Sequence, residues 1–267
     1  QRIGVISLIP KGTKDKKSLK NWRPITLLST LYKVISGVIG NRFKKVLPLI
    51  IEPGQEGFVD GRYMGEVTRL LYDTIYDAYS CKGKSGVIMS VDFEKAFDSV
   101  SFSFMEKVIE TAGFPKIMQT WVKILLNGFS SHINHAGNLL KLIQLGRGAR
   151  QGDPIASILF VLAIEILLIA IRTNPKIEPY RFETMNALDK PITNKVGAYA
   201  DDVNIMMPRS ESSIKETVST LDRFEKIAGL RVNKDKTQML RIGKEAASAP
   251  ELCKDLGLKW VTRMKIL

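Results

Sequence analysis

Hydrophobic residues follow two different periods along the chain, which predicts a mixture of strands and helices. Alternating or continuous apolar runs typical of strands occupy residues 3–9, 86–91, 196–200, 203–207 and 238–242. Apolar residues at helical spacing occupy residues 27–47, 65–79, 102–111, 116–126 and 211–228. Interleaving of this kind favours an α+β fold with an antiparallel core sheet.

Two further segments have a different pattern. Residues 155–171 are almost wholly apolar, are interrupted by Glu165, and follow Asp153-Pro154, an N-cap residue and a first-turn proline. We therefore predict a long buried helix rather than a membrane span, for which the stretch is marginal. Polar residues dominate 127–144, which predicts a hairpin.

An acidic pair interrupts the apolar runs 196–200 and 203–207. Asp201 and Asp202 would form the two-residue tip of a β-hairpin, with two negative charges within a few ångströms of each other. A divalent ion such as Mg²⁺ neutralises such a pair and is bound through carboxylate oxygens. The alternative is an Asp-rich turn that faces solvent, because aspartate is common in turns.

A third carboxylate stands at the end of another predicted strand. The apolar run 86–91 leads directly to Asp92. If this strand lies beside the acidic hairpin, Asp92, Asp201 and Asp202 converge on one point, as a two-metal phosphoryl-transfer site requires. One ion would activate an attacking hydroxyl, and the other would hold a triphosphate and stabilise the leaving group.

Three segments carry a family resemblance. Residues 92–98 (Asp-Phe-Glu-Lys-Ala-Phe-Asp), 147–154 (Arg-Gly-Ala-Arg-Gln-Gly-Asp-Pro) and 199–202 (Tyr-Ala-Asp-Asp) resemble motifs A, B and C of reverse transcriptases, in that order. The similarity is greatest to the enzymes of non-LTR, LINE-type retrotransposons. Five more segments resemble other blocks of the same family: residues 9–11, 21–25, 55–62, 229–237 (motif D) and 256–257 (primer grip).

The resemblance implies a right-handed polymerase fold with fingers and palm, an antiparallel palm sheet flanked by helices, and no thumb. It places the fingers at residues 1–85 and the palm at residues 86–267. A fingers-side hairpin would be inserted near residues 127–147. The chain begins with Gln1 rather than methionine and ends ten residues after the primer-grip segment, so we expect it to be a piece of a longer protein.

The resemblance also implies roles for individual residues. Asp92, Asp201 and Asp202 would be catalytic and would bind two Mg²⁺ ions, or Mn²⁺ in their place, together with the backbone of Phe93. The residues implied to bind the nucleotide are Lys11, Arg23, Phe97, Gln151, Gly152 and Lys236. Those implied to contact nucleic acid are Arg62, Arg150 and Tyr199.

Some of these positions have competing interpretations. Phe97 is placed where the family has an aromatic gate against a ribose 2′-hydroxyl, which implies a preference for deoxynucleotides; the alternative is a core aromatic. Lys236 is a candidate proton donor to pyrophosphate or one more exposed lysine. For Asp98 we favour a helix cap over a role in catalysis.

Charge agrees with a polynucleotide partner. The chain has 40 Lys and Arg against 27 Asp and Glu, a net charge of +13, and residues 1–50 hold eleven basic residues and one acid. Such an excess attracts phosphate backbones and predicts binding that weakens as salt rises. In the polar stretch 11–20 a solvated cationic face is an equally good explanation.

The sequence therefore predicts an RNA-directed DNA polymerase acting on an RNA template, a DNA primer and dNTPs. The alternatives are a group II intron-type maturase and a nucleic-acid-binding fragment without activity. Only two cysteines, Cys81 and Cys253, are present, which fits a reducing intracellular compartment, nuclear or cytoplasmic.

Overall fold

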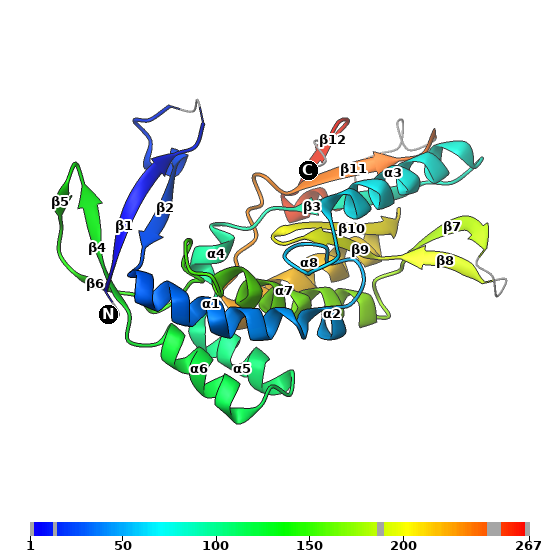
Figure 1. Ribbon diagram of the computed structural model, residues 1–267. Helices are drawn as coiled ribbons and strands as arrows, with labels where there is room; N and C mark the ends of the chain where they lie inside the picture. Colours follow the sequence, from blue (N-terminus) through cyan, green and yellow to red (C-terminus); the bar gives the residue numbers. More distant parts are fainter. Residues whose placement is uncertain (1–2, 13–14, 186–189, 245–251, 265–267) are drawn as a thin grey trace. The chain divides into compact units, whose positions relative to one another are not determined.

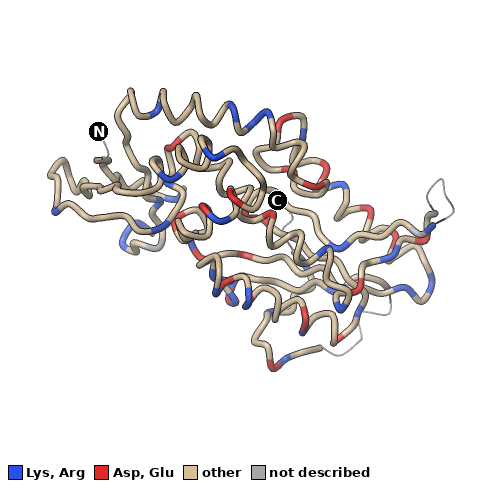
Figure 2. The backbone as a smooth tube through the Cα atoms, turned by 90° about the horizontal axis from the view of Figure 1, so that it is seen from below, with Lys and Arg blue, Asp and Glu red and all other residues tan. Residues whose placement is uncertain are grey.

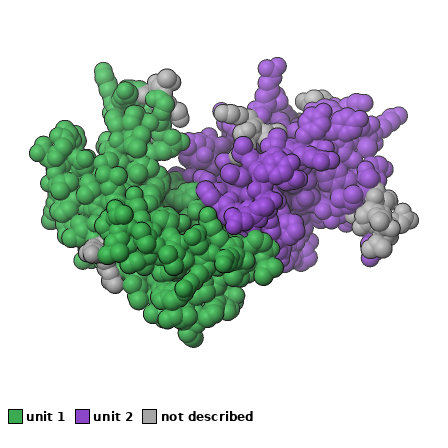
Figure 3. All heavy atoms as spheres, in the orientation of Figure 1, with its two compact units in different colours: residues 1–50, 95–163 green, residues 51–94, 164–267 purple. Residues whose placement is uncertain are grey.

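The computed structural model describes residues 3–12, 15–185, 190–244 and 252–264. The chain forms two compact units, shown in different colours in Figure 3. Unit 1 comprises residues 1–50 and 95–163, and unit 2 comprises residues 51–94 and 164–267. Each unit is therefore assembled from two separate stretches of chain.

Unit 1 contains a sheet in the order β2-β1-β4-β5, with β6 paired to β4. Its strands are β1 (Ile3–Pro10), β2 (Trp22–Leu27), β4 (Ser130–His135), β5 (Asn138–Leu139) and β6 (Ile143–Gln144) (Figure 1). The predicted hairpin in the polar segment is confirmed as the antiparallel pair β4–β5. In addition, β4 pairs in parallel with β1, a long-range contact that the local pattern did not indicate.

The helices of unit 1 largely match the predicted ranges. They are α1 (Thr30–Lys44), α2 (Leu47–Ile50), α4 (Ala96–Ser99), α5 (Phe102–Thr111), α6 (Lys116–Leu126) and the first part of α7 (Ala156–Thr173), with a 3₁₀ turn at Leu19–Asn21. The predicted helix over 27–47 starts too early, because Leu27 ends β2 opposite Val5. Ser29 then caps α1 by accepting a hydrogen bond from the Tyr32 N–H.

Helix α7 is the apolar segment anticipated above. By length and composition it is long enough to cross a membrane, but 67% of it is buried within the protein. Among the described residues it is the one helix with these properties. Its burial agrees with the predicted core helix.

Unit 2 is built on a five-stranded sheet in the order β12-β11-β3-β10-β9 (Figure 1). The strands are β3 (Gly86–Val91), β9 (Val196–Tyr199), β10 (Asp202–Pro208), β11 (Gln238–Ile242) and β12 (Lys259–Val261). The central strand β3 pairs antiparallel with both β10 and β11, and β9 pairs antiparallel with β10. The predicted antiparallel sheet is confirmed except at its edge, where β12 runs parallel to β11.

Helices and a second hairpin complete unit 2. They are α3 (Met64–Ser80), the rest of α7, the hairpin β7 (Tyr180–Met185) and β8 (Pro191–Asn194), α8 (Glu211–Ala228) and a 3₁₀ turn at Lys254–Leu256. Val67 and Leu71 of α3 pack with Ile88 and Met206 of the sheet in one buried cluster. Burial of these apolar side chains fixes the sheet against the helix.

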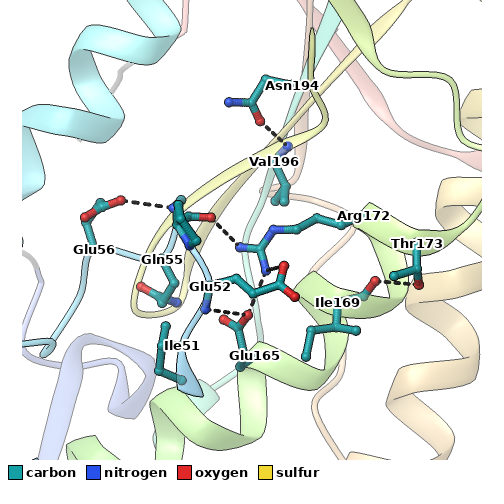
Figure 4. A network of polar contacts seen from close by, with 12 residues as sticks. Ile51, Glu52, Gln55, Glu56, Glu165, Ile169, Arg172, Thr173, Asn194 and Val196 are labelled. Carbon is teal, nitrogen blue, oxygen red and sulfur yellow. Dashed lines mark hydrogen bonds and ion pairs between the residues drawn. The ribbon is translucent and has the colours of Figure 1, made fainter. Parts of the chain in front are cut away.

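A buried ion pair joins helix α7 to the loop that precedes α3. Glu165 is 2% exposed, and its Oε1 lies 2.7 Å from Arg172 Nη1. The same oxygen accepts a hydrogen bond from the Glu52 N–H, and Arg172 also donates to the Pro53 carbonyl (Figure 4). Burial raises the pKa of the Glu165 carboxyl, and the Arg172 charge opposes that shift.

We expect the Arg172→Met variant to lose about 3–5 kcal/mol of unfolding free energy, because it leaves the Glu165 carboxylate buried without its partner. The double variant Glu165→Met/Arg172→Met removes both charges and should lose much less. Urea unfolding of the three chains measures the difference. Equal losses of unfolding free energy in the single and double variants would show that the unpaired Glu165 carboxylate is not the cause of the destabilisation.

Candidate active site

Strand pairing in unit 2 brings together two of the three predicted carboxylates. Val91 of β3 lies opposite Val203 of β10, so the next position along each strand is Asp92 on one and Asp202 on the other. Opposite residues in an antiparallel pair have Cβ atoms about 4.5–5.5 Å apart. The expectation that these strands adjoin is confirmed.

The turn between β9 and β10 differs from the prediction by one residue. Asp202 is still paired with Tyr199, so the two-residue turn is Ala200-Asp201 rather than Asp201-Asp202. Ala200 has φ of +55°, a left-handed conformation that is unusual for alanine. Asp201 therefore stands at the tip, while Asp202 is the first residue of β10.

Burial and neighbouring charges affect the ionisation of the Asp201 and Asp202 carboxyls. Burial raises the pKa of Asp201, as does the nearby charge of Asp92, while a backbone hydrogen bond opposes the shift. Partial burial also raises the pKa of Asp202, followed by the charges of Asp201 and Asp92. Both carboxyls consequently take up protons at a higher pH than an ordinary aspartate, and a cation bound among them would relieve the repulsion.

The loop after α8 holds Asp92 from one side. The Asp92 N–H donates to Thr237 Oγ1 at 3.2 Å, and the Asp92 carbonyl accepts from the Asn233 N–H at 2.8 Å. Lys236 reaches the same residue, with Nζ 3.4 Å from Asp92 Oδ1, and its side chain is 66% exposed. Lys236 thus lies at the carboxylate cluster, where its charge partly balances Asp92.

The carboxylates suit Mg²⁺ by donor type but are not arranged as a finished metal site. Within the described part of the chain, no group of three or more His, Cys, Asp or Glu side chains has the geometry of a metal site. The joint binding of metal ions by all three side chains stays a prediction. Hard oxygen donors, two of which have raised pKa values, nevertheless fit a divalent cation. Phe93, whose backbone is a predicted ligand, is buried beside Val232.

Arg62 and Tyr199 complete the predicted residues of unit 2. Arg62 donates to the backbone carbonyls of Ile51, Glu52 and Gln55 at 2.7–2.8 Å. Its guanidinium therefore fastens its own loop, and its contact with nucleic acid stays a prediction. Tyr199 is half-buried in β9, with its ring centroid 6.5 Å from that of Phe58.

Lys11 and Arg23 lie on the β1–β2 hairpin of unit 1. The Lys11 N–H donates to the Asn21 carbonyl at 2.8 Å, and Arg23 is exposed on β2. In Figure 2 the backbone next to the N-terminus carries blue residues and few red ones, as its sequence requires. The basic character of this hairpin thus comes mainly from the lysines of the segment that joins β1 to β2, with Arg23 on β2 itself.

Asp98 lies within α4 in the same unit. Burial raises its pKa, and the charges of Lys95 and Lys11 oppose that shift. The predicted helix-cap role is wrong, because Ser101 occupies the N-cap position of α5 and Asp98 is a helical residue of α4.

The motif B segment forms a tight loop against β2. Gly152 has φ of +107°, and a Cβ there would lie 2.7 Å from the Thr26 carbonyl oxygen, so only glycine fits. The Gln151 carbonyl accepts the Thr26 N–H at 2.9 Å. The Phe97 ring stacks on Phe160 with centroids 4.3 Å apart, so a helix of the core supports its position.

Arg150 is buried rather than available to a phosphate, which corrects its predicted role. Arg150 Nη2 donates to the Asp153 carboxylate at 2.8 Å and to the Leu125 carbonyl at 2.9 Å. The same group contacts the Tyr32 hydroxyl, which donates to Asp153 at 2.7 Å. Its guanidinium carbon lies 3.5 Å from the centre of the Phe129 ring. This arrangement fixes the start of the motif B loop from within.

We expect Arg150→Met to lower the melting temperature by several degrees, because Asp153 loses its buried partner. The salt dependence of RNA binding should keep its slope, since no phosphate contact is removed; each lost contact would reduce the slope by about 0.7. Arg23→Met, at an exposed position, is the control and should leave the melting temperature unchanged. A shallower salt slope in Arg150→Met would restore the phosphate-contact interpretation.

An antiparallel sheet that presents an acidic hairpin beside a strand ending in aspartate is the arrangement that the resemblance implies for a polymerase palm. Residues 9–267 match the family described as reverse transcriptase (RNA-dependent DNA polymerase), so the chain belongs to that family. Its predicted fingers-and-palm fold and its resemblance to non-LTR retrotransposon proteins are confirmed.

Similar proteins come from transposable elements. The chain is 30% identical to the transposon TX1 uncharacterized 149 kDa protein of Xenopus laevis, over 91% of the chain and 18% of that protein. It is 27% identical to the Pol polyprotein of the R2 retrotransposable element of Popillia japonica, over 88% of the chain and 32% of that protein. The chain therefore spans less than a third of the length of either relative.

Solved structures share the fold at low sequence identity. Telomerase from Candida tropicalis, in complex with a fragment of telomeric RNA, superposes with a TM-score of 0.64 at 12% identity, over 93% of this chain and 42% of that one. Telomerase from Candida albicans gives a TM-score of 0.62 at 13% identity, over the same shares of the two chains.

Sequence reasoning missed the contacts of the loop that precedes α3. Gln55-Glu-Gly-Phe58 is recognisable as a family block, but its pattern gives no indication that Gln55 bonds to the acidic turn 145 residues later. Tyr32 and Ser36, which both bond to Asp153, were missed for the same reason. These partners are distant in the sequence and belong to no local period.

Proposed function

We propose that this chain is the polymerase portion of a retrotransposon reverse transcriptase, which joins dNTPs to a primer 3′-hydroxyl on an RNA template. The observation that carries the proposal is the register of β3 and β10, which aligns Asp92 with Asp202 next to the turn that bears Asp201. Membership of the reverse transcriptase family supports the same reaction. The enzyme class is that of nucleotidyltransferases.

The carboxylates of Asp92, Asp201 and Asp202, with the backbone of Phe93, would hold two Mg²⁺ ions or Mn²⁺ in their place. When bound, such ions lower the pKa of the attacking hydroxyl and stabilise charge on the leaving pyrophosphate. Metal binding requires ionised aspartates. Because the pKa values of Asp201 and Asp202 are raised, activity should fall as the pH drops toward the acidic range. Lys236, now paired with Asp92, would give a proton from Nζ to pyrophosphate.

Residues of unit 1 would bind the nucleotide. Lys11 and Arg23 would contact the triphosphate, as a point charge and a planar fork donor respectively. Gln151 and Gly152 would approach the nucleotide through the backbone of the motif B loop, and Phe97 would exclude a 2′-hydroxyl. The fingers at 1–85 and the palm at 86–267 are proposed on the same sequence motifs.

RNA template and DNA primer are the proposed macromolecular partners, and the net charge of +13 supports binding to their phosphates. A group II intron-type maturase would share these motifs. The rival from another class is an inactive RNA-binding fragment. The excess of 40 basic over 27 acidic residues supports RNA binding by that rival as well.

Primer extension on an RNA template with dNTPs and Mg²⁺ tests the proposal. We expect extension by the parent chain and a loss of at least about 100-fold in Asp201→Asn, because one metal ligand is removed. EDTA should abolish extension by the parent. The variant should melt at the same temperature or slightly higher, since neutralising Asp201 removes repulsion from Asp92.

The melting temperature is the control for folding. If the parent fails to extend the primer but binds RNA and releases it as salt rises, the inactive binding fragment is correct. If Asp201→Asn extends as well as the parent, incorporation does not depend on this carboxylate and the two-metal proposal fails.

We expect Phe97→Ala to incorporate ribonucleotides, because the ring proposed to clash with the 2′-hydroxyl is removed. The ratio of kcat/KM for dNTP to that for rNTP should fall by about 10-fold or more. Phe160→Leu loses the stacking partner of Phe97 but keeps the gate ring, and it should change the ratio less. Unchanged sugar discrimination in Phe97→Ala would make Phe97 a core aromatic only.

A further inference from the structure

The turn that carries Asp201 is held by a side chain from a distant part of unit 2. Gln55 is fully buried, at 0% exposure. Its Oε1 accepts the Ala200 N–H at 2.9 Å, and its Nε2 donates to the Ala200 carbonyl at 3.3 Å. One carboxamide thus satisfies both backbone groups of the residue that precedes Asp201.

The Gln55 loop is itself attached to the edge of the sheet. The Ala198 N–H donates to the Gly54 carbonyl at 2.6 Å, and the Glu56 N–H donates to the Ala198 carbonyl at 2.8 Å. Gln55 forms a parallel bridge with Ala198 on β9. The loop therefore continues the hydrogen bonding of the sheet up to the point where the acidic turn begins.

Gly57 allows this close approach. A Cβ on Gly57 would lie 2.3 Å from the Ala200 nitrogen, closer than real atoms come. The Gly57 N–H also donates to Gln55 Oε1 at 2.8 Å, which orients the carboxamide toward the turn. The glycine is therefore needed for space, and its N–H sets the direction of the amide.

Other contacts hold the loop in place. Arg62 binds three carbonyls of the loop, including that of Gln55. Arg172 binds the Pro53 carbonyl, and Glu165 accepts the Glu52 N–H (Figure 4). Hydrogen bonds from both ends of the loop thus fix the position of Gln55.

We infer that Gln55 is a positioning residue for the Asp201 carboxylate. Ala200 has φ of +55°, a conformation that persists where its surroundings enforce it. The Gln55 carboxamide supplies that constraint, because it offers an acceptor and a donor in one plane that match the N–H and C=O of Ala200. Without it the Ala200 peptide is free to rotate and to redirect Asp201. The inference rests on the proposed function in one respect, namely that the Asp201 carboxylate binds a metal ion.

Amide hydrogen exchange of the full chain tests the contact itself. We expect the Ala200 amide to exchange about 100-fold or more slowly than an unstructured amide, although it lies in a turn. In Gln55→Met, which keeps the volume and loses both hydrogen bonds, exchange should approach the unprotected rate. Rapid exchange of the Ala200 amide in the parent would overturn the inference without any variant.

Titration of the chain with Mn²⁺ alone tests the consequence for metal binding. We expect Gln55→Met to bind Mn²⁺ about 10-fold more weakly, and its kcat to fall with little change in KM for dNTP. Val59→Ala is the matched control: Val59 is a buried apolar residue of the same loop, and its truncation should lower the melting temperature while leaving Mn²⁺ affinity unchanged.

The outcomes separate this inference from the proposed function. Equal loss of Mn²⁺ affinity in Gln55→Met and Val59→Ala would overturn it, because a general loss of stability would then explain the effect. A parent chain that neither binds Mn²⁺ nor extends a primer would refute the proposed function. Hydrogen exchange of the Ala200 amide would still test the contact between Gln55 and Ala200. If Gln55→Met does not fold, Gln55→Glu keeps the acceptor, and rapid exchange of the Ala200 amide there would overturn the contact.

Discussion

The antiparallel pairing of β3 with β10 is the constraint on which the rest of unit 2 depends. It aligns Asp92 with Asp202 and places Asp201 in the adjoining turn, so negative charges gather at one end of the sheet. Burial and mutual repulsion raise the pKa values of Asp201 and Asp202. Such an arrangement is unfavourable by itself, and apolar packing of both strands must outweigh it.

The surrounding structure restrains Asp92 and Asp201 through the backbone. Thr237 and Asn233 bond to the backbone of Asp92, whereas Gln55 bonds to the residue before Asp201. Hydrogen bonds to the backbone set the direction of a side chain without occupying its carboxylate oxygens. Direct hydrogen bonds to those oxygens would compete with a ligand. The Asp92 carboxylate also has a side-chain partner, the exposed amine of Lys236.

Two arginines of the motif blocks, one in each unit, bind neighbouring segments of the chain. Arg62 binds backbone carbonyls of its own loop, and Arg150 is enclosed by Tyr32, Asp153 and Phe129. A guanidinium has five donors in a rigid plane, so it can join several chain segments at once. A motif that contains arginine therefore does not by itself indicate a phosphate contact, and burial distinguishes the two roles.

The sequence by itself determined the local elements and the motifs of the family. The helices 102–111, 116–126 and 211–228 begin and end as predicted, because periodicity and local end signals such as Gly229, at φ of +78°, are short-range properties. Only the tertiary structure decided the position of the acidic turn, the parallel pairing of β1 with β4, and the partners of Gln55 and Arg150. These features depend on contacts between residues far apart in the chain, whose geometry is set by packing of the whole unit and leaves no periodic signal in the sequence.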